Sequence, residues 1–519
     1  MSDVTFQLLA IGIYFAAMIA IGVYAARKTK SHEDYMLAGR ELNPFTAALS
    51  AGASDMSGWL LMGLPGAIYA FGLIEAWIAI GLTIGAYLNW KLVAPRLRAY
   101  TEVARNSITI PSFFENRLRD RSRLLRIVSG LIILVFFTFY VSSGMVAGGV
   151  FFESSFGAEY LWGMLLVSGV TLLYTLFGGF LGASLTDVVQ GMMMFLALII
   201  IPVIAFFTVG GLQGVQEGIA DSGAQLQGLI PADLDGVAVL GIVSSLAWGL
   251  GYVGQPHIIV RFMALKSVAA ARPARRIGIG WMIISLVGAV ISGFVGIAYV
   301  QQSGLGLENP ETVVLAMSQA LLHPFVAGLV LAAVLAAIMS TLSSQLIVCS
   351  SALVEDLFQV FVKRQPSQRT LVLLGRACVL AVAAIAALLA INPSDTILGL
   401  VGFAWAGFGA AFGPVVLLSL FWRRLTNWGA LAGMVVGAAT VFIWDAIEKA
   451  TQIEFFTLYE IVPGFVLNLL VAVVVSLLTH RHDEEVQEEF TRTGTMVAVR
   501  AGEPAHVSAA AAADRNVLP

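Results

Sequence analysis

Residues 50–66 read SAGASDMSGWLLMGLPG and place one carboxylate, Asp55, inside a long apolar stretch. An aspartate at the centre of a bilayer costs about 2.5–3.5 kcal/mol on insertion scales. A helix interrupted near Ser57 and Gly58 would free backbone carbonyls on one side of the break and amides on the other. Carbonyls suit a hard monovalent cation, and amides at a helix N-terminus suit a carboxylate. The stretch therefore predicts a binding site. The alternative is that the glycines allow close helix packing and that Asp55 pairs with another polar residue.

A second stretch, residues 244–262 (SSLAWGLGYVGQPHIIVRF), has a similar character. Trp248 and Tyr252 are spaced i,i+4 and share one face of a helix. Four residues weaken that helix, namely Gly249, Gly251, Gly254 and Pro256. Discontinuous helices at matching positions in two halves of a membrane protein indicate a transport site. The alternative is packing glycines combined with aromatic side chains at the lipid interface.

Hydroxyl groups lie deep in two further apolar runs. Ser340 and Thr341 are adjacent in AAIMSTLSSQ, residues 336–345, and Tyr140 lies in FTFYVSSG. Such serines and threonines usually bond to a carbonyl of their own helix. They become plausible cation ligands only if their helix faces the break near Ser57. Tyr140 is more often a packing residue than a ligand.

Three charged residues stand at the edges of apolar runs. Asp187 follows LFGGFLGAS and is interpreted as the cap of a helix start, with a place on an ion exit path as the alternative. Arg40 and Arg376 serve either membrane topology or gating. The six histidines and two cysteines show no ligand spacing, so we expect no transition metal.

The elements that position these residues must be membrane helices. Of the 519 residues, 58% are hydrophobic and only 12% are charged, whereas an ordinary soluble protein is about 25% charged. The mean hydropathy is +0.87. We find no nucleotide-binding motif, so we expect a transporter that does not use ATP directly, and not an enzyme. A net charge of −3 does not favour a nucleic-acid partner.

Thirteen apolar runs approach or exceed the ~20 residues needed to cross a bilayer. They are 6–26, 44–72, 74–95, 127–152, 160–180, 185–210, 237–259, 277–300, 320–358, 371–391, 396–421, 428–446 and 457–479. The run at 320–358 is too long for one simple span.

The distribution of positive charge gives the orientation. With thirteen spans, 28 of the 29 Lys and Arg residues fall on one face, and only Lys449 falls on the other. Because cytoplasmic loops are enriched in Lys and Arg, the N-terminus is expected outside and the C-terminus inside. The tail after residue 480 is acidic and then alanine-rich, and we expect it to be disordered.

The two interrupted spans are the second and the seventh, five spans apart. An odd offset gives the two five-span units opposite orientations, which predicts an inverted repeat. We therefore divide the chain into an extra N-terminal helix with the first loop (1–43), a first repeat (44–236), a second repeat (237–425), two C-terminal helices (426–480) and the tail (481–519).

Four motifs, in this order along the chain, resemble the sodium/solute symporter family. They are SAGASDMSGWLLMGLPGA, YTLFGGFLGASLTD, WGLGYVGQPHIIVRFMA and AAIMSTLSSQL, and the likeness extends from about residue 6 to 480. Within the family, the first and third motifs resemble the bacterial proline-transporting branch. The resemblance implies an all-α polytopic membrane protein with a leucine-transporter-type 5+5 inverted repeat and about 13 transmembrane helices.

The resemblance also implies two sets of site residues. A sodium site would use carbonyls of Ala53, Met56 and Ala337 and hydroxyls of Ser340 and Thr341, and Asp55 would support it electrostatically. The substrate pocket would be lined by Ser57, Gly58, Trp59, Tyr140, Trp248, Tyr252 and Pro256. Arg40, Asp187 and Arg376 are candidates for gating or ion exit because of their positions at the edges of apolar runs, not because of the resemblance.

The implied activity is Na⁺-coupled uptake of L-proline by alternating access, in the inner (cytoplasmic) membrane of a bacterium. Na⁺ would be the only ion required, and L-proline and membrane lipid would be the only partners. We expect no obligatory protein partner. Three alternatives stay open: symport of another small solute such as pantothenate, a short carboxylate or a sugar; a membrane sensor built on the same fold; and a passive channel.

Overall fold

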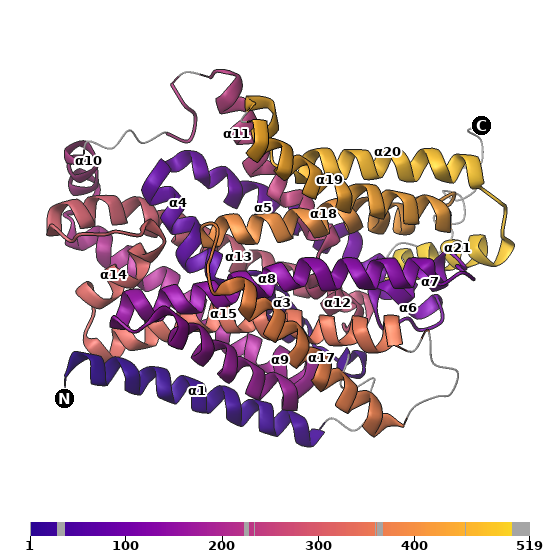
Figure 1. Cartoon of the computed structure of the whole chain (residues 1–519), viewed down its shortest axis with the longest axis horizontal. Helices are drawn as coiled ribbons and strands as arrows, with labels where there is room; N and C mark the ends of the chain where they lie inside the picture. The colour runs from indigo at the N-terminus through magenta and orange to yellow at the C-terminus, as the bar shows by residue number, and fades with distance from the viewer. Residues whose placement is uncertain are drawn as a thin grey trace.

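The computed structural model describes residues 2–28, 37–222, 228–232, 234–358, 360, 367–451 and 453–500. This part of the chain is helical apart from turns, connecting segments and one isolated β-bridge, between Leu42 and Leu265. Figure 1 shows that most long helices run roughly along one axis, with the N-terminus at one end of the bundle and helix α21 at the other. The arrangement is that of a multi-pass membrane bundle.

Within the described ranges, eleven helical segments are long and apolar enough to cross a membrane. They are formed by α1 (Asp3–Lys28), α5 (Ala76–Leu88) continuing into α6 (Ala94–Val103), α8 (Leu124–Phe156), α9 (Tyr160–Thr208), α11 (Gly236–Ala247) continuing into η5 (Trp248–Gly254), α13 (Ala271–Ser303), α15 (Pro324–Ser351), α17 (Gln368–Ala390), α18 (Ile397–Phe421), α19 (Asn427–Thr451) and α20 (Ile461–Thr479).

Helix α9 is long enough to cross a membrane twice. Its 49 residues would span about 74 Å at ~1.5 Å per residue, more than twice the ~30 Å hydrocarbon core. Gly179 breaks it, with φ 57° and ψ −159°. Beyond the break, Gly182 packs against Ala25 of α1, and the Gln190 amide then donates to the Tyr14 hydroxyl at 2.8 Å. Residue numbers thus rise along α9 as they fall along α1, so this half runs antiparallel to α1.

Both predicted interruptions are present. α3 (Pro44–Asp55) stops at Asp55, and after a short non-helical step the chain continues through the π-turn η2 (Trp59–Gly63) into α4 (Leu64–Phe71). The second break is η5, a 3₁₀ segment that leads into α12 (Pro256–Met263). With the α3–α4 pair and the second pass of α9, the eleven segments become the thirteen crossings expected from the sequence.

Several short helices were not expected. They are α7 (Ile110–Arg117), α10 (Gly211–Asp221), α14 (Val313–Leu321) and α21 (Glu484–Arg500). The run at 320–358 was expected to be too long for one simple span, but α15 (Pro324–Ser351) continues directly into the π-helical segment η8 (Ala352–Phe358) as one helical segment.

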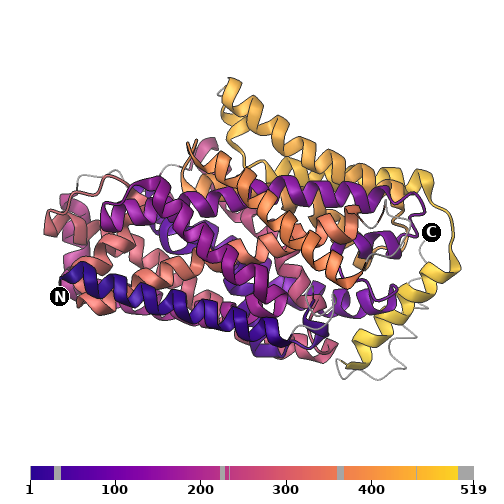
Figure 2. The same cartoon turned by 60° about the horizontal axis from the view of Figure 1, so that its bottom comes forward.

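The tail is also corrected, because residues 484–500 form α21 instead of being disordered. Figure 2 shows α21 packed against one end of the bundle. Its Phe490 is buried beside Tyr100, with ring centroids 6.2 Å apart, and its Glu489 pairs with Arg119 at 2.8 Å. Residues 501–519 of the predicted disordered tail lie outside the described residues.

The centre of the bundle is formed by α15 and α18. In the most apolar stretch of each helix 83% of the residues are buried, against 33% in α1 and 28% in α19. α15 therefore lies where its hydroxyl groups can reach the interior, while α1 and α19 lie at the periphery.

Candidate ion- and solute-binding site

The break of α3 meets the middle of α15. The Ser340 hydroxyl donates to the Ala53 carbonyl at 2.6 Å and lies 3.0 Å from the Ala337 carbonyl. All three residues are fully buried. The Ser340 hydroxyl on α15 therefore contacts a carbonyl of α3 that is 287 residues away in the sequence, as well as a carbonyl of its own helix.

Further oxygen atoms at this junction lack the partners that a regular helix would give them. Thr341 is 2% exposed, and its hydroxyl has no hydrogen-bond partner in the described part of the chain. Met56 caps α3 with φ −80° and ψ 81°, so the helical hydrogen-bond ladder ends there. The last carbonyls of a helix need other partners. The junction is therefore a cluster of neutral oxygen atoms in an apolar interior.

Asp55 links the two broken helices. It is 1% exposed, and its Oδ2 accepts a hydrogen bond from the Tyr252 hydroxyl on η5. Its Oδ1 has no hydrogen-bond partner among the residues described. Its backbone carbonyl accepts the Trp59 indole N–H at 3.1 Å. Asp55 is therefore paired with a polar residue, Tyr252, as expected if it only stabilises helix packing. Its Oδ1 atom remains available for a further interaction, such as with a bound cation.

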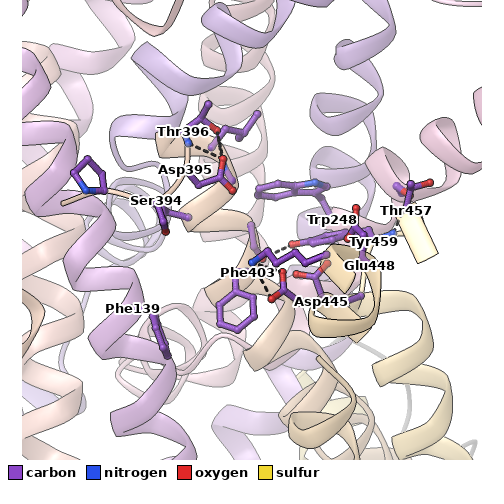
Figure 3. Close-up of a pocket in the computed structure, with 18 of the residues that line it drawn as sticks. Phe139, Trp248, Ser394, Asp395, Thr396, Phe403, Asp445, Glu448, Thr457 and Tyr459 are labelled. Carbon is purple, nitrogen blue, oxygen red and sulfur yellow. Dashed lines mark hydrogen bonds and ion pairs between the residues drawn. The ribbon is translucent and has the colours of Figure 1, made fainter. Parts of the chain in front are cut away.

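Aromatic side chains surround the same region. Trp59 lies near Trp248, with ring centroids 6.5 Å apart, and Trp248 stacks on Tyr459 at 5.4 Å and 26°, as Figure 3 shows for the latter pair. Tyr140 meets the ring of His257 edge-on at 5.9 Å, next to Pro256 at the start of α12.

The predicted substrate residues fall into this region. Ser57, Gly58, Trp59, Tyr140, Trp248, Tyr252 and Pro256 all lie on or against the two breaks and are all buried. Gly58 faces Ala147 on α8 and Ile338 on α15.

Unpaired polar atoms gather around the breaks. In the described structure the hydroxyls of Ser57 and Tyr140, the Gln255 side-chain oxygen and both ring nitrogens of His257 are buried without a hydrogen-bond partner. At least about 90% of buried polar groups in proteins are paired. Their concentration here indicates a place where water or a polar solute binds. Gln255 and His257 were missed from the sequence, although the GQPH segment put two polar side chains directly beside a helix break.

A cavity of about 840 Å³ leads toward this region from the end of the bundle opposite to α21. Figure 3 shows Trp248, Tyr459, Phe403 and Phe139 in its wall. The lining also holds one lysine, Lys449, and five carboxylates: Glu75, Asp395, Asp445, Glu448 and Glu460.

The charge of this cavity varies near neutral pH. Burial, together with the nearby charges of Asp445 and Glu448, raises the pKa of the Glu460 carboxyl to about 7; a hydrogen bond with its own backbone and the charge of Lys449 oppose the rise. Glu460 lies just before α20. Its ionisation therefore changes over the range from about pH 6 to pH 8.

The other end of the polar interior is closed by a buried ion pair. Arg261 on α12 and Asp187 on α9 are 1% and 0% exposed and lie 3.3 Å apart. Ser50 donates to Asp187 at 2.6 Å, and Arg261 donates to the hydroxyls of Ser50 and Ser344 at 3.1 and 2.6 Å. Four helices, α3, α9, α12 and α15, meet at this pair.

Two interpretations from the sequence are corrected by this pair. Asp187 is not a helix cap, because it lies eight residues beyond Gly179 and its side chain binds Ser50. Arg261 lies two residues beyond the predicted span 237–259, which would place it in a loop, but it is buried inside α12. Asp187 and Arg261 are 74 residues apart in the sequence, so local residue spacing could not predict that they pair.

Arg40 and Arg376 both lie at the α21 end of the bundle. Arg40 donates to Thr101 at 3.2 Å, to the Met263 carbonyl at 3.0 Å and to the Ser107 carbonyl at 2.6 Å, and so ties α6 to the end of α12. Arg376 donates to a carbonyl of α9, that of Leu176, at 3.0 Å. Neither arginine is hydrogen-bonded to a residue at the helix interruptions near Ser57 or in η5.

A model of the sodium:solute symporter family matches residues 35–437. The chain belongs to this family. It is 54% identical over 479 residues to the osmoregulated proline transporter OpuE of Bacillus subtilis (strain 168), covering 91% of this chain and 95% of the relative. It is 56% identical over 476 residues to the high-affinity proline transporter PutP of the same organism, covering 91% and 98%. It is 49% identical over 496 residues to the sodium/proline symporter of Staphylococcus aureus (strain JH9), covering 94% and 95%.

Solved structures confirm the predicted fold of this symporter. A Na⁺-coupled sialic acid symporter in a substrate-bound outward-open state matches with a TM-score of 0.74 at 19% identity, covering 92% of this chain and 99% of that one. Mhp1, a nucleobase-cation-symport-1 family transporter, matches with a TM-score of 0.53 at 13% identity, covering 88% and 98%. The fold is the leucine-transporter type, with about thirteen crossings as expected.

Proposed function

We propose that this symporter couples the movement of Na⁺ to the uptake of L-proline by alternating access. The observation that carries the proposal is the junction of α3 and α15, where Ser340 joins the carbonyls of Ala53 and Ala337. The unpartnered hydroxyl of Thr341 follows directly in the chain. Relatives that are 49–56% identical and are named as proline transporters support L-proline as the solute.

The oxygen cluster at the junction would receive Na⁺. Hard cations prefer oxygen ligands, and a hydroxyl keeps lone pairs for a cation when it gives up its role as a donor. The ligands would be the carbonyls of Ala53, Met56 and Ala337 and the hydroxyls of Ser340 and Thr341. Asp55 supports the cation by its negative charge and does not act as an acid or base.

The amides after the break would receive the carboxylate of proline. Gly58 and Trp59 begin the half-helix formed by η2 and α4, and the N-terminus of a helix attracts anions. The pyrrolidine ring would lie against Trp59 and Trp248. Ser57, Tyr140, Tyr252 and Pro256 complete the lining of the pocket.

Coupling follows from the segment that the two sites share. Residues 53–59 contribute both to the cation site and to the solute pocket, so each ligand favours the same conformation of this segment. Such coupling is reciprocal and typically amounts to 1–3 kcal/mol. Na⁺ binds first, orders residues 53–59 and completes the pocket for proline.

The state of the two ends of the bundle supports an outward-facing conformation. The acidic cavity opens at one end, whereas Arg261 and Asp187 close the other. Opening inward would break this pair, which makes Asp187 a gate residue, while Arg40 and Arg376 hold the helices around it.

The orientation follows the positive-inside rule, with the N-terminus outside and α21 in the cytoplasm. The protein would lie in a bacterial inner membrane.

It moves its solute by means of the Na⁺ gradient and performs no enzymatic reaction. The two inverted repeats, with their boundary at the start of α11, would rock against each other.

The proposal is tested by uptake of labelled L-proline into proteoliposomes with and without an inward Na⁺ gradient. We expect accumulation above equilibrium in the wild type, loss of accumulation in Asp55→Asn, and accumulation in Ser340→Ala only at raised Na⁺ concentrations. Equal uptake from Na⁺ and choline media would contradict sodium coupling. Na⁺-dependent thermal protection of the protein without proline uptake would retain the ion and exclude proline as the solute.

A further inference from the structure

The unwound segment η5 is held from outside by two side chains. A 3₁₀ segment of seven residues followed by an extended residue, Gln255, loses the regular α-helical ladder, so its carbonyls need other partners. The indole Nε1 of Trp405 on α18 donates to the Trp248 carbonyl at 2.8 Å. The Asn89 amide, at the end of α5, donates to the Tyr252 carbonyl at 3.0 Å. Trp248 and Tyr252, the two aromatic residues of η5, therefore each have the backbone carbonyl held by a side chain from outside the segment.

Trp405 also contacts the side chains of both aromatic residues. Its ring stacks on Trp248 with centroids 6.3 Å apart at 28°, and it meets Tyr252 edge-on at 5.1 Å and 87°. The Gln255 side chain donates to the Trp405 carbonyl at 3.1 Å. Trp405 is 1% exposed. It thus touches both ends of η5 and both aromatic rings.

The fit between Trp405 and η5 is close. A Cβ added to Gly251 would lie 1.9 Å from the Trp405 Nε1 atom, so only glycine leaves room for the indole. Gly251 lies between Trp248 and Tyr252 and directly precedes Tyr252. The indole therefore fills the inside of the turn and fixes how far apart these two residues lie.

We propose that Trp405 is a positioning residue that sets the separation of Trp248 and Tyr252, and thereby the size of the ring that the solute pocket accepts. The solute itself rests on the function proposed above. Trp405 acts through the two residues that face the solute and not by touching it. Its effect is therefore expected on the selection of solute and not on the sodium site, which lies between α3 and α15.

The first test is Trp405→Phe, which keeps an aromatic ring and removes the donor to the Trp248 carbonyl. We expect the KM for L-proline to rise about tenfold, within the range for a buried carbonyl left without its donor. The preference for L-proline over its six-membered homologue, L-pipecolate, should fall by a similar factor. The Na⁺ concentration for half-maximal uptake should change less than about twofold.

A second variant approaches the same contact from the other side. Gly251→Ala forces its Cβ against the indole, and we expect the same rise in the KM for L-proline. The control is Trp77→Phe at the start of α5, which also loses an indole N–H bond to a carbonyl, that of Leu229 at 2.7 Å, in an exposed bond that involves neither Trp405 nor η5. We expect the control to retain the wild-type KM and ring-size preference.

Amide hydrogen exchange over residues 248–255 tests the clamp without relying on transport. We expect exchange to accelerate about tenfold in Trp405→Phe and Gly251→Ala, and to stay at the wild-type rate in Trp77→Phe. Unchanged exchange and unchanged ring-size preference would overturn the inference while leaving proline symport intact. An equal rise in the half-saturating concentrations of Na⁺ and of proline would also overturn it, because that indicates general destabilisation. A wild type without Na⁺-driven uptake would refute the proposed function, and the exchange rates would still decide the role of Trp405.

Discussion

Replacing Ser340 by alanine removes the group that joins α3 to α15. The hydroxyl donates to the Ala53 carbonyl at 2.6 Å and lies 3.0 Å from the Ala337 carbonyl. In the sodium-bound state proposed here, the same oxygen would turn its lone pairs toward the cation. Ser340→Ala therefore removes one of the five proposed oxygen ligands and leaves three carbonyls and the Thr341 hydroxyl in place, so sodium binding should be weakened and not abolished.

The magnitude follows from the type of contact that is lost. A contact between a neutral oxygen and a charged group is worth about 1.5–3 kcal/mol when it resembles a hydrogen bond to an ion. This range corresponds to a rise of about 10- to 150-fold in the Na⁺ concentration for half-maximal uptake. The maximal rate at saturating Na⁺ should change far less, because the proline pocket keeps its side chains.

The assay is initial uptake of L-proline at increasing Na⁺, with choline keeping the ionic strength constant. Ser292→Ala is the matched control, because the buried Ser292 hydroxyl bonds only to a carbonyl of its own helix, that of Gly288 at 2.7 Å. We expect the control to retain the wild-type Na⁺ dependence. A lower maximal rate with unchanged Na⁺ half-saturation in Ser340→Ala would refute the reasoning, and so would an equal shift in both variants.

Three further predictions concern other parts of the molecule. Asp187→Asn leaves the buried guanidinium of Arg261 without its counter-ion, so the free energy of unfolding should fall by about 3–5 kcal/mol, measured by thermal denaturation in detergent. Lowering the pH from 8 to 6 protonates Glu460, whose pKa is raised to about 7, so the cavity attracts less Na⁺ and the Na⁺ half-saturation should rise; Glu460→Gln should remove this pH dependence. Phe490→Ala removes the buried anchor of α21 and should accelerate tryptic cleavage within this helix, whereas Thr491→Ala, at an exposed position of the same helix, should not.

Each of these predictions has an outcome that contradicts it. A loss below 1 kcal/mol in Asp187→Asn would mean that the ion pair is not needed to hold the four helices together. A pH dependence that persists in Glu460→Gln would show that a group other than Glu460 causes it. Equal cleavage rates in Phe490→Ala and Thr491→Ala would show that α21 is not held through Phe490.

The two breaks could be predicted because their causes are local. Asp55 and the glycines around Ser57 are incompatible with an ordinary lipid-facing helix, and Pro256 follows three glycines within eight residues. The two crossings made by α9 could also be predicted, because this part of the chain contains two apolar runs, 160–180 and 185–210, each about long enough to cross a bilayer. Membrane thickness and glycine chemistry are enough to identify such features.

The contacts between the breaks could not be predicted, because they join residues far apart in the sequence. Tyr252 reaches Asp55 across 197 residues, and Trp405 reaches Trp248 across 157. Trp405 lies in the apolar run 396–421, where a tryptophan is an ordinary membrane-helix residue and does not indicate a specific contact. Its role depends on the unpaired carbonyl that the folded η5 presents to it.

Arg261 and α21 were missed for a different reason. Charge was used to find the cytoplasmic loops, so a buried arginine was counted as a loop residue. The segment that becomes α21 was interpreted from its acidic composition, although Val486 and Phe490 are spaced i,i+4 on the face that is buried. It is held by ion pairs such as Glu489 with Arg119 and by Phe490, which lies 5.2–5.6 Å from the guanidinium groups of three arginines.

The central claim is that the cation site and the solute pocket share one segment, residues 53–59, and so bind cooperatively. The most direct measurement is equilibrium binding of labelled L-proline to the purified protein in Na⁺ and in choline at equal ionic strength. We predict that Na⁺ tightens proline binding by about 5- to 150-fold, and that proline tightens Na⁺ binding by the same factor. Equal proline affinity in Na⁺ and in choline would contradict the coupling.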